Sequence, residues 1–87
     1  MNSRATRRFW QRYRDLPLHI QQRARKAYQL WQDNPRHPGL HFKRVDDQQP
    51  IYSIRVTDAY RVLGLLEGDT MIWFWIGGHD EYERMLK

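Results

Sequence analysis

The second half of the chain contains four short segments with strand character, each connected to the next by a few mainly polar residues. The segments cover approximately residues 40–45, 51–56, 60–66 and 70–76, and the connectors are DDQQP, TDA and EGD. Asp, Gly and Pro in such connectors are typical of turns. Because short links favour neighbouring strands that run in opposite directions, the pattern predicts an antiparallel meander.

The first half has the pattern of two helices. We predict a short helix over residues 5–14 and a second helix with Pro17 in its first turn, Asp15 as its N-cap and an end near Asp33. The following DNPRHPG, with two prolines and a glycine, stops the second helix. The apolar stripe of the second helix recurs at helical spacing and consists of Ile20, Ala24, Ala27, Tyr28 and Trp31.

The order of these elements, helices first and strands after, predicts an α+β fold. An N-terminal helical hairpin should pack on one face of a mainly antiparallel sheet of about four strands. A length of 87 residues predicts a single domain over positions 1–87. The strand at 70–76 has no polar face, and Trp73 and Trp75 alternate with Ile72, Phe74 and Ile76. This strand is therefore expected to be central and covered on both sides.

Composition favours a cytoplasmic protein. The chain has no cysteine, whereas small extracellular domains usually depend on disulfides. It contains no apolar run close to the roughly 20 residues that span a bilayer. Its basic N-terminus is not followed by the apolar stretch of a secretory signal. We therefore expect no membrane partner.

Charge is unevenly distributed along the chain. Residues 1–36 hold nine Lys/Arg and two Asp, a net +7, whereas residues 37–87 hold six Lys/Arg and eight Asp/Glu, a net −2. Arg23, Arg25 and Lys26 lie off the apolar stripe of the second helix and are candidate nucleic-acid-binding residues. A basic half indicates an anionic partner, either nucleic acid, an acidic protein or a membrane surface. A solvated Arg-rich surface explains the same charge equally well.

No metal or cofactor is expected from the motifs. The chain has no cysteine, and His37 and His41, which are four residues apart, flank a turn instead of lying on one helix as in a zinc site. The glycines form neither a phosphate-binding loop nor a dinucleotide fingerprint.

Cationic and proton-exchanging side chains cluster instead on or just after the predicted strands. Such cations suit a phosphate backbone, since arginine can donate two hydrogen bonds to phosphate oxygens. A nearby imidazole or phenol supplies the proton transfer that RNA cleavage by its own 2′-hydroxyl needs. Ordinary cross-strand pairs, such as Arg55 with Asp58 or Arg61 with Glu67, are the alternative explanation. The side chains concerned are Lys43, Arg44, Arg55, Arg61, His79, Tyr82 and Arg84.

The segment IYSIRVTDAYRVLGLLEGDTMIWFWIGGHDEY resembles the C-terminal sheet of the RelE/ParE superfamily of bacterial toxins. In that family a strand ends in a basic residue, YR opens the next strand, and an apolar strand ends in Gly-His or Gly-Arg with a tyrosine soon after. The matching residues here are Arg55, Tyr60-Arg61, Gly78-His79 and Tyr82. LPLHIQQRARKAYQLWQDNPRHPGLHFKRV is similar to the second helix, proline break and first long strand of the family. Many members begin with a strand, but MNSRATRRF has poor strand character.

The resemblance implies a toxin that a protein antitoxin neutralises. RelE-like members cleave mRNA in the ribosomal A site without a metal, whereas ParE-like members inhibit DNA gyrase and are not nucleases. By the same resemblance, Arg61 would stabilise the scissile phosphate, Arg55 and Lys43 would assist it, His79 would act as acid or base, and Tyr82 would orient the substrate or share the proton transfer. Arg44 would belong to the nucleic-acid-binding set.

Three functions follow as hypotheses. The first is a RelE-like, ribosome-dependent mRNA endoribonuclease whose partners are the antitoxin, the ribosome and mRNA. The second is a ParE-like inhibitor that binds DNA gyrase through the Arg-rich hairpin. The third is a binding domain for nucleic acid or protein that has no toxicity.

Overall fold

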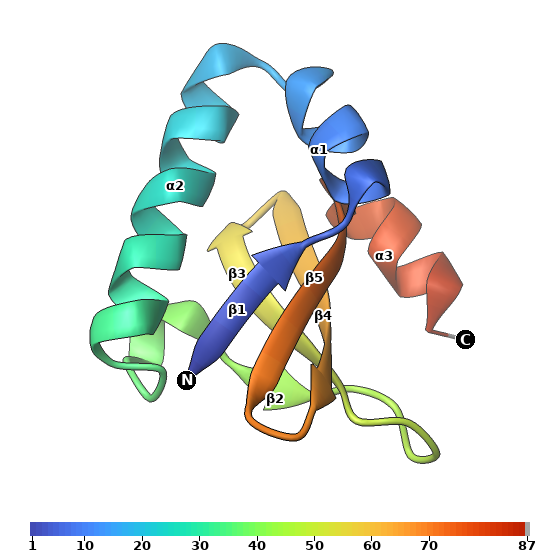
Figure 1. Cartoon of the computed structure of the whole chain (residues 1–87). Coiled ribbons are helices and arrows are strands. Elements are labelled where there is room, and N and C mark those ends of the chain that lie inside the picture. The colour runs from blue at the N-terminus through green and yellow to red at the C-terminus, as the bar shows by residue number, and fades with distance from the viewer. Residues whose placement is uncertain (87) are drawn as a thin grey trace.

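The computed structural model describes residues 1–86, and Figure 1 shows a helical hairpin beside a sheet, with a short helix at the C-terminal end. In chain order the elements are β1 (Asn2–Ala5), α1 (Arg7–Arg14), α2 (Leu18–Asp33), a 3₁₀ turn (Pro38–Leu40), β2 (Lys43–Arg44), β3 (Ile51–Thr57), β4 (Tyr60–Glu67), β5 (Thr70–Gly78) and α3 (His79–Met85). The predicted α+β class and the N-terminal helical hairpin are confirmed. Among the described residues, no helix is both long and apolar enough to cross a bilayer.

The sheet has five strands in the order β1-β5-β4-β3-β2, one more than expected. Strands β2 to β5 form the predicted antiparallel meander, and β1 pairs with β5 in parallel. The expectation that the N-terminus is a poor strand was wrong. The segment has a low intrinsic strand propensity, but its backbone hydrogen bonds to the apolar strand β5 hold it extended. Its side chains alternate as in a strand: Ser3 and Ala5 are partly buried, whereas Asn2 and Arg4 are exposed.

Three predicted boundaries also need correction. The strand expected at 40–45 is reduced to Lys43–Arg44, because a 3₁₀ turn and a left-handed His41, with φ of 47°, interrupt the extended chain before it. Asp15 ends α1 and does not cap α2, whose N-cap is Pro17. Helix α1 begins at Arg7, since the Thr6 hydroxyl accepts a hydrogen bond from the Phe9 N–H and caps the helix.

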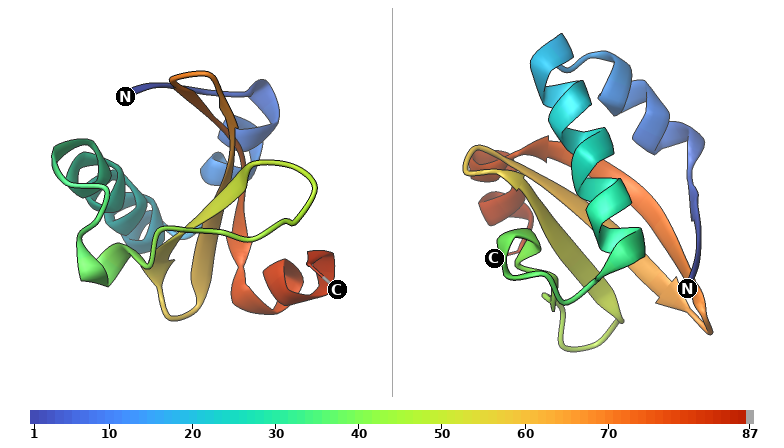
Figure 2. Two further views of the ribbon diagram at one scale, coloured as in Figure 1. Left: turned by 90° about the horizontal axis from the view of Figure 1, so that it is seen from below. Right: turned by 90° about the vertical axis from the view of Figure 1, so that its left-hand side faces the viewer.

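The two faces of the sheet carry different helices. Figure 2 shows α2 on one side and α3 on the other. The larger core lies between the sheet and the hairpin, around the fully buried Trp31, Met71 and Ile76. A smaller core of Leu63, Trp75 and Tyr82 lies under α3. Strand β5 lies between β1 and β4 with apolar packing on both faces, as predicted.

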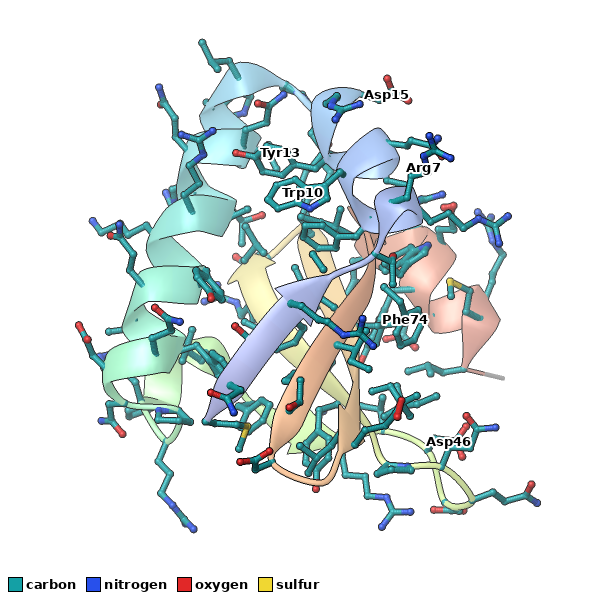
Figure 3. All side chains as sticks on the ribbon, viewed as in Figure 1. Arg7, Trp10, Tyr13, Asp15, Asp46 and Phe74 are labelled. Carbon is teal, nitrogen blue, oxygen red and sulfur yellow. The ribbon has the colours of Figure 1, made fainter. Side chains whose placement is uncertain are left out.

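A β-bulge in β5 changes the expected facing of its tryptophans. Leu63 pairs with Trp75 and the adjacent Gly64 pairs with Trp73, so that Phe74 is the extra residue. Trp73 therefore packs under the hairpin, whereas Trp75 packs under α3. Simple alternation had placed both tryptophans on one face, which was wrong. Figure 3 shows Phe74 on the α3 side of the strand.

Candidate functional site

A cleft of about 350 Å³ lies on the α3 face of the sheet. The chain that leads into β2 lines one side of the cleft and α3, which follows β5, lines the other, because β3 and β4 lie between β2 and β5 in the sheet and form the floor. Of the cations and proton-exchanging residues singled out from the sequence, the cleft brings together Lys43, Arg44, Arg61, His79 and Tyr82. Arg55 and Arg84 are not among its lining residues. The full lining is His41, Lys43, Arg44, Val45, Ser53, Arg61, His79, Tyr82, Glu83 and Leu86.

Arg61 is held by the turn between β3 and β4. Its Nη1 donates hydrogen bonds to the carbonyl oxygens of Thr57, at 2.5 Å, and Tyr60, at 3.1 Å. Within residues 1–86 no hydrogen bond involves its Nε or Nη2, so part of the guanidinium stays available to an anion in the cleft. It forms no ion pair with Glu67, which lies at the other end of β4.

Arg55 faces Arg61 across the β3–β4 pair but is engaged elsewhere. Its guanidinium forms an ion pair with Asp58 in the β3–β4 turn. The hydrogen bond from Arg55, together with its charge, lowers the pKa of the Asp58 carboxyl below its usual value. The alternative of an ordinary local ion pair is thus observed for Arg55.

His79 is the first residue of α3 and also a wall of the cleft. Its backbone N–H donates to the Ala59 carbonyl at 2.7 Å, which ties the start of α3 to the β3–β4 turn. Its imidazole Nε2 lies 3.2 Å from Oε1 of Glu83, one helical turn later. His79 therefore begins α3 and lines the cleft at the same time.

Tyr82 is a buried member of the same helix. Its ring centroid lies 5.7 Å from that of His79, three residues earlier, so the two side chains share a face of the helix. Its hydroxyl donates to the buried Ser53 hydroxyl at 3.3 Å. With only 5% of its surface exposed, Tyr82 fixes the position of α3 and of the cleft floor.

Arg12 of α1 anchors α3 from the other side. Its Nη2 lies 2.8 Å from Oε2 of Glu81, and its Nε donates to the Ile76 carbonyl at 2.8 Å. The guanidinium also lies 4.9 Å from the centre of the Trp75 ring, as a cation–π contact. Gly77 makes room for this arrangement, because a Cβ there would be 2.8 Å from Arg12 Nη2.

Ser53 and His41 are among the cleft residues to which the sequence analysis assigned no part in this site. Ser53 pairs with Lys43 across β3 and β2, a register that the strand pattern alone did not fix. His41 was considered only as a metal ligand, and its place follows from the left-handed backbone after the 3₁₀ turn. Within the described residues no three His, Asp or Glu side chains gather to hold a metal ion.

The basic residues predicted on the second helix lie away from the cleft. Arg23, Arg25 and Lys26 are exposed on α2, across the sheet from α3. Arg25 donates from Nε to the Tyr13 hydroxyl at 2.7 Å. The structure therefore separates the two groups of predicted nucleic-acid-binding residues.

The hairpin side carries a second hollow, an apolar groove of about 420 Å³ between β1, α1 and α2. Trp10 lines it with 45% of its surface exposed, and Figure 3 shows Trp10 and Tyr13 in the space between the two helices. The indole N–H of Trp73, another lining residue, is buried without a hydrogen-bond partner. Arg4 and Arg25 also line the groove.

Solved structures with this fold define the class of protein. A chain of the RelB–RelE antitoxin–toxin complex from Methanococcus jannaschii superposes with a TM-score of 0.74 at 20% identity, covering 95% of this chain and 98% of that chain. The YoeB/ParE toxin from Agrobacterium tumefaciens gives 0.71 at 14% identity, with 91% and 99% covered. The intact E. coli RelBE toxin–antitoxin complex gives 0.67 at 14% identity, with 87% and 93% covered. The fold is therefore that of the RelE/ParE toxins.

The sequence itself assigns the family. Residues 18–84 match the family described as the ParE-like toxin domain, and the chain belongs to that family. The predicted membership of the RelE/ParE superfamily is confirmed. A comparison with curated proteins found no significant match.

Proposed function

We propose that the chain is the toxin of a type II toxin–antitoxin pair and acts in the cytoplasm as a metal-independent, ribosome-dependent mRNA endoribonuclease. The observation that carries this proposal is the cleft in which His79 faces the cations Lys43, Arg44 and Arg61. Cations in a concave site bind a phosphodiester, and a partly exposed imidazole beside them can transfer a proton.

The proposed chemistry is attack of the 2′-hydroxyl on the adjacent phosphorus. Arg61 and Lys43 stabilise the charge that develops on the phosphate oxygens. His79 transfers a proton to or from the reacting oxygens. Tyr82 holds α3 and Ser53 in place and has little direct access to RNA, because its ring is buried. Arg55 acts at most through the turn that it shares with Arg61, since it pairs with Asp58.

The second part of this proposal concerns the basic residues of α2 and the ribosome. The exposed Arg23, Arg25 and Lys26 lie across the sheet from the cleft, so they cannot contact the scissile phosphate at the same time as His79 does. We assign them to ribosomal RNA, which a basic surface attracts through its backbone charge.

A protein antitoxin is the proposed partner on the hairpin side. Two of the three structural relatives named above are antitoxin–toxin complexes. The groove offers an apolar lining and an exposed Trp10 against which a partner could pack. An acidic partner suits the net +7 of residues 1–36 by electrostatic steering.

Primer extension on cellular mRNA after brief induction tests the nuclease. The wild-type chain should give cuts inside translated codons, and His79→Ala should abolish them. His19→Ala is the matched control, because His19 is an exposed histidine on α2, outside the cleft. Equal cutting by the wild type and His79→Ala would show that the cleft does not carry out the cleavage.

Inhibition of DNA gyrase is the second candidate, and the exposed Trp10 on the Arg-rich hairpin is the observation that favours it. Under this candidate, growth arrest persists in His79→Ala, disappears in Trp10→Ala, and occurs with DNA damage but without mRNA cuts. Normal growth with the wild-type chain would instead favour a non-toxic binding domain.

A further inference from the structure

His41 has a backbone conformation that residues with a side chain rarely adopt. Its φ of 47° is the one positive value outside glycine among residues 1–86. A Cβ is crowded by the following carbonyl in this conformation, whereas glycine adopts it freely. Histidine is one of the residues that tolerate it better than most, so a plain turn-ending role is the competing explanation.

The imidazole at this position lines the cleft on the wall opposite α3. His41 precedes β2, His79 begins α3, and Ser53 and Arg61 lie between them on the floor. Lys43 pairs with Ser53 in the antiparallel β2–β3 pair, so the chain before Lys43 lies towards the end of β3 and its turn into β4. The two walls of the cleft thus each carry a histidine.

Cleavage of RNA by its 2′-hydroxyl needs two proton transfers on opposite sides of phosphorus. The attacking and leaving oxygens stand roughly in line during transfer of a phosphoryl group. A base must reach the first oxygen and an acid the second, so two groups on facing walls suit the reaction better than two neighbours on one helix. His41 and His79 occupy such positions, whereas Tyr82 is buried beside His79.

We propose that His41 is a catalytic residue of the cleft and works with His79 as its acid–base pair; this rests on the proposed nuclease function. His41 takes the proton from the 2′-hydroxyl as the 2′ oxygen bonds to phosphorus. The bond from phosphorus to the 5′ oxygen breaks, and the 5′ oxygen takes a proton from His79. The products are a 2′,3′-cyclic phosphate and a 5′-hydroxyl, and exchange with water restores both rings.

Charged groups surround both rings. Glu83 lies beside His79, with its Oε1 3.2 Å from the imidazole Nε2, and can hold that ring in one orientation. Lys43, Arg44 and Arg61 line the cleft with His41 and are available to the phosphate between the two rings. The Asp58 carboxylate in the β3–β4 turn is paired with Arg55.

The left-handed backbone at His41 allows the imidazole to be removed without a loss of stability. His41→Gly removes the imidazole and relieves the crowding, so its unfolding temperature should equal or exceed that of the wild type. His41→Asn keeps a side chain that tolerates the conformation but cannot exchange the proton. Cleavage of mRNA on programmed ribosomes should fall about 100-fold or more in both variants, since general acid–base catalysis contributes at least that factor.

The pH dependence separates a base from a structural role. Wild-type cleavage should rise and then fall with pH, and the rise at low pH, which reports a base that must be neutral, should disappear in His41→Asn. Rates within threefold of wild type in both variants, while His79→Ala is inactive, would overturn the role of His41 and leave the proposed function standing. Absence of cleavage by the wild-type chain would overturn both.

Discussion

Gly64 offers the sharpest test of how the core is packed. It lies in β4 opposite Trp73, and a Cβ there would be 2.5 Å from Trp73 Cε3 and 2.8 Å from Met71 Sδ. Ordinary contacts begin near 3.5 Å, so the added methyl group overlaps both neighbours. Met71 is fully buried and Trp73 is only 5% exposed, which leaves neither side chain free space to move.

The expected cost of Gly64→Ala follows from two opposing effects. Overpacking at this severity should cost about 3 kcal/mol, the upper end of the usual range. Removing a flexible glycine from a strand returns about 0.5–1 kcal/mol. The free energy of unfolding should therefore fall by about 2 kcal/mol, which corresponds to a decrease of roughly 8–16 °C in unfolding temperature for a domain of this size.

Urea and thermal unfolding of matched glycine variants measure this effect. At Gly78 the nearest atom to an added Cβ is the Ala59 carbonyl oxygen at 3.9 Å, and φ is −71°, so Gly78→Ala should change stability by less than about 0.5 kcal/mol. Gly68 has φ of 60° and open space around it, so Gly68→Ala should cost about 1 kcal/mol through the backbone alone. The packing argument fails if Gly64→Ala is no less stable than Gly78→Ala.

Three further outcomes can be measured on the same purified chain. Arg12→Ala should lower the free energy of unfolding by about 1–2 kcal/mol and raise hydrogen exchange in α3, and a double-mutant cycle with Glu81→Ala should give a coupling energy of about 0.5–1 kcal/mol. Zero coupling would contradict their ion pair. Tyr82→Phe should cost about 1 kcal/mol in urea unfolding, since the buried Ser53 hydroxyl loses its partner, and an unchanged midpoint would show that this hydroxyl is satisfied otherwise. In an NMR titration the Asp58 carboxyl should have a pKa below the ordinary value of about 3.9. Because this pKa is lowered in the folded state, the carboxylate stabilises the fold at pH values above about 3.9, and the stabilisation is lost as the pH falls through the folded pKa. A titration midpoint at or above 3.9 would contradict the pairing.

The sequence predicted those strands that are marked by a run of apolar residues between two turns. Strands β3, β4 and β5 have dense apolar residues between turns, and their bounds lie within two residues of expectation. Strand β1 was missed because Asn2–Ala5 becomes extended only by pairing with β5, a neighbour far along the chain. The bulge at Phe74 was missed for a related reason: alternation indicates a face only while the register is regular.

In the candidate site, too, residues marked by the local sequence were predicted, whereas positions that depend on tertiary geometry were not. Lys43, Arg61 and His79 were predicted because their residue types and their places at strand ends are visible in the sequence, and all three line the cleft. Arg55 was placed in the site, although the structure shows it paired with Asp58, three residues away. His41 was not predicted to line the cleft, because its position depends on a left-handed backbone that the residue pattern of the turn does not indicate.

The position of His79 depends on tertiary contacts more than on its own helix. Helix α3 has only seven residues, and isolated helices that short are marginal in water. Its location is therefore set by Arg12, which reaches it from α1, and by Tyr82, which is buried against Ser53. Substitutions at these anchors should displace the imidazole as well as lower stability, whereas Gly64→Ala acts on the opposite core. Comparing cleavage at equal folded fractions would thus separate residues that position the site from those that only maintain the fold.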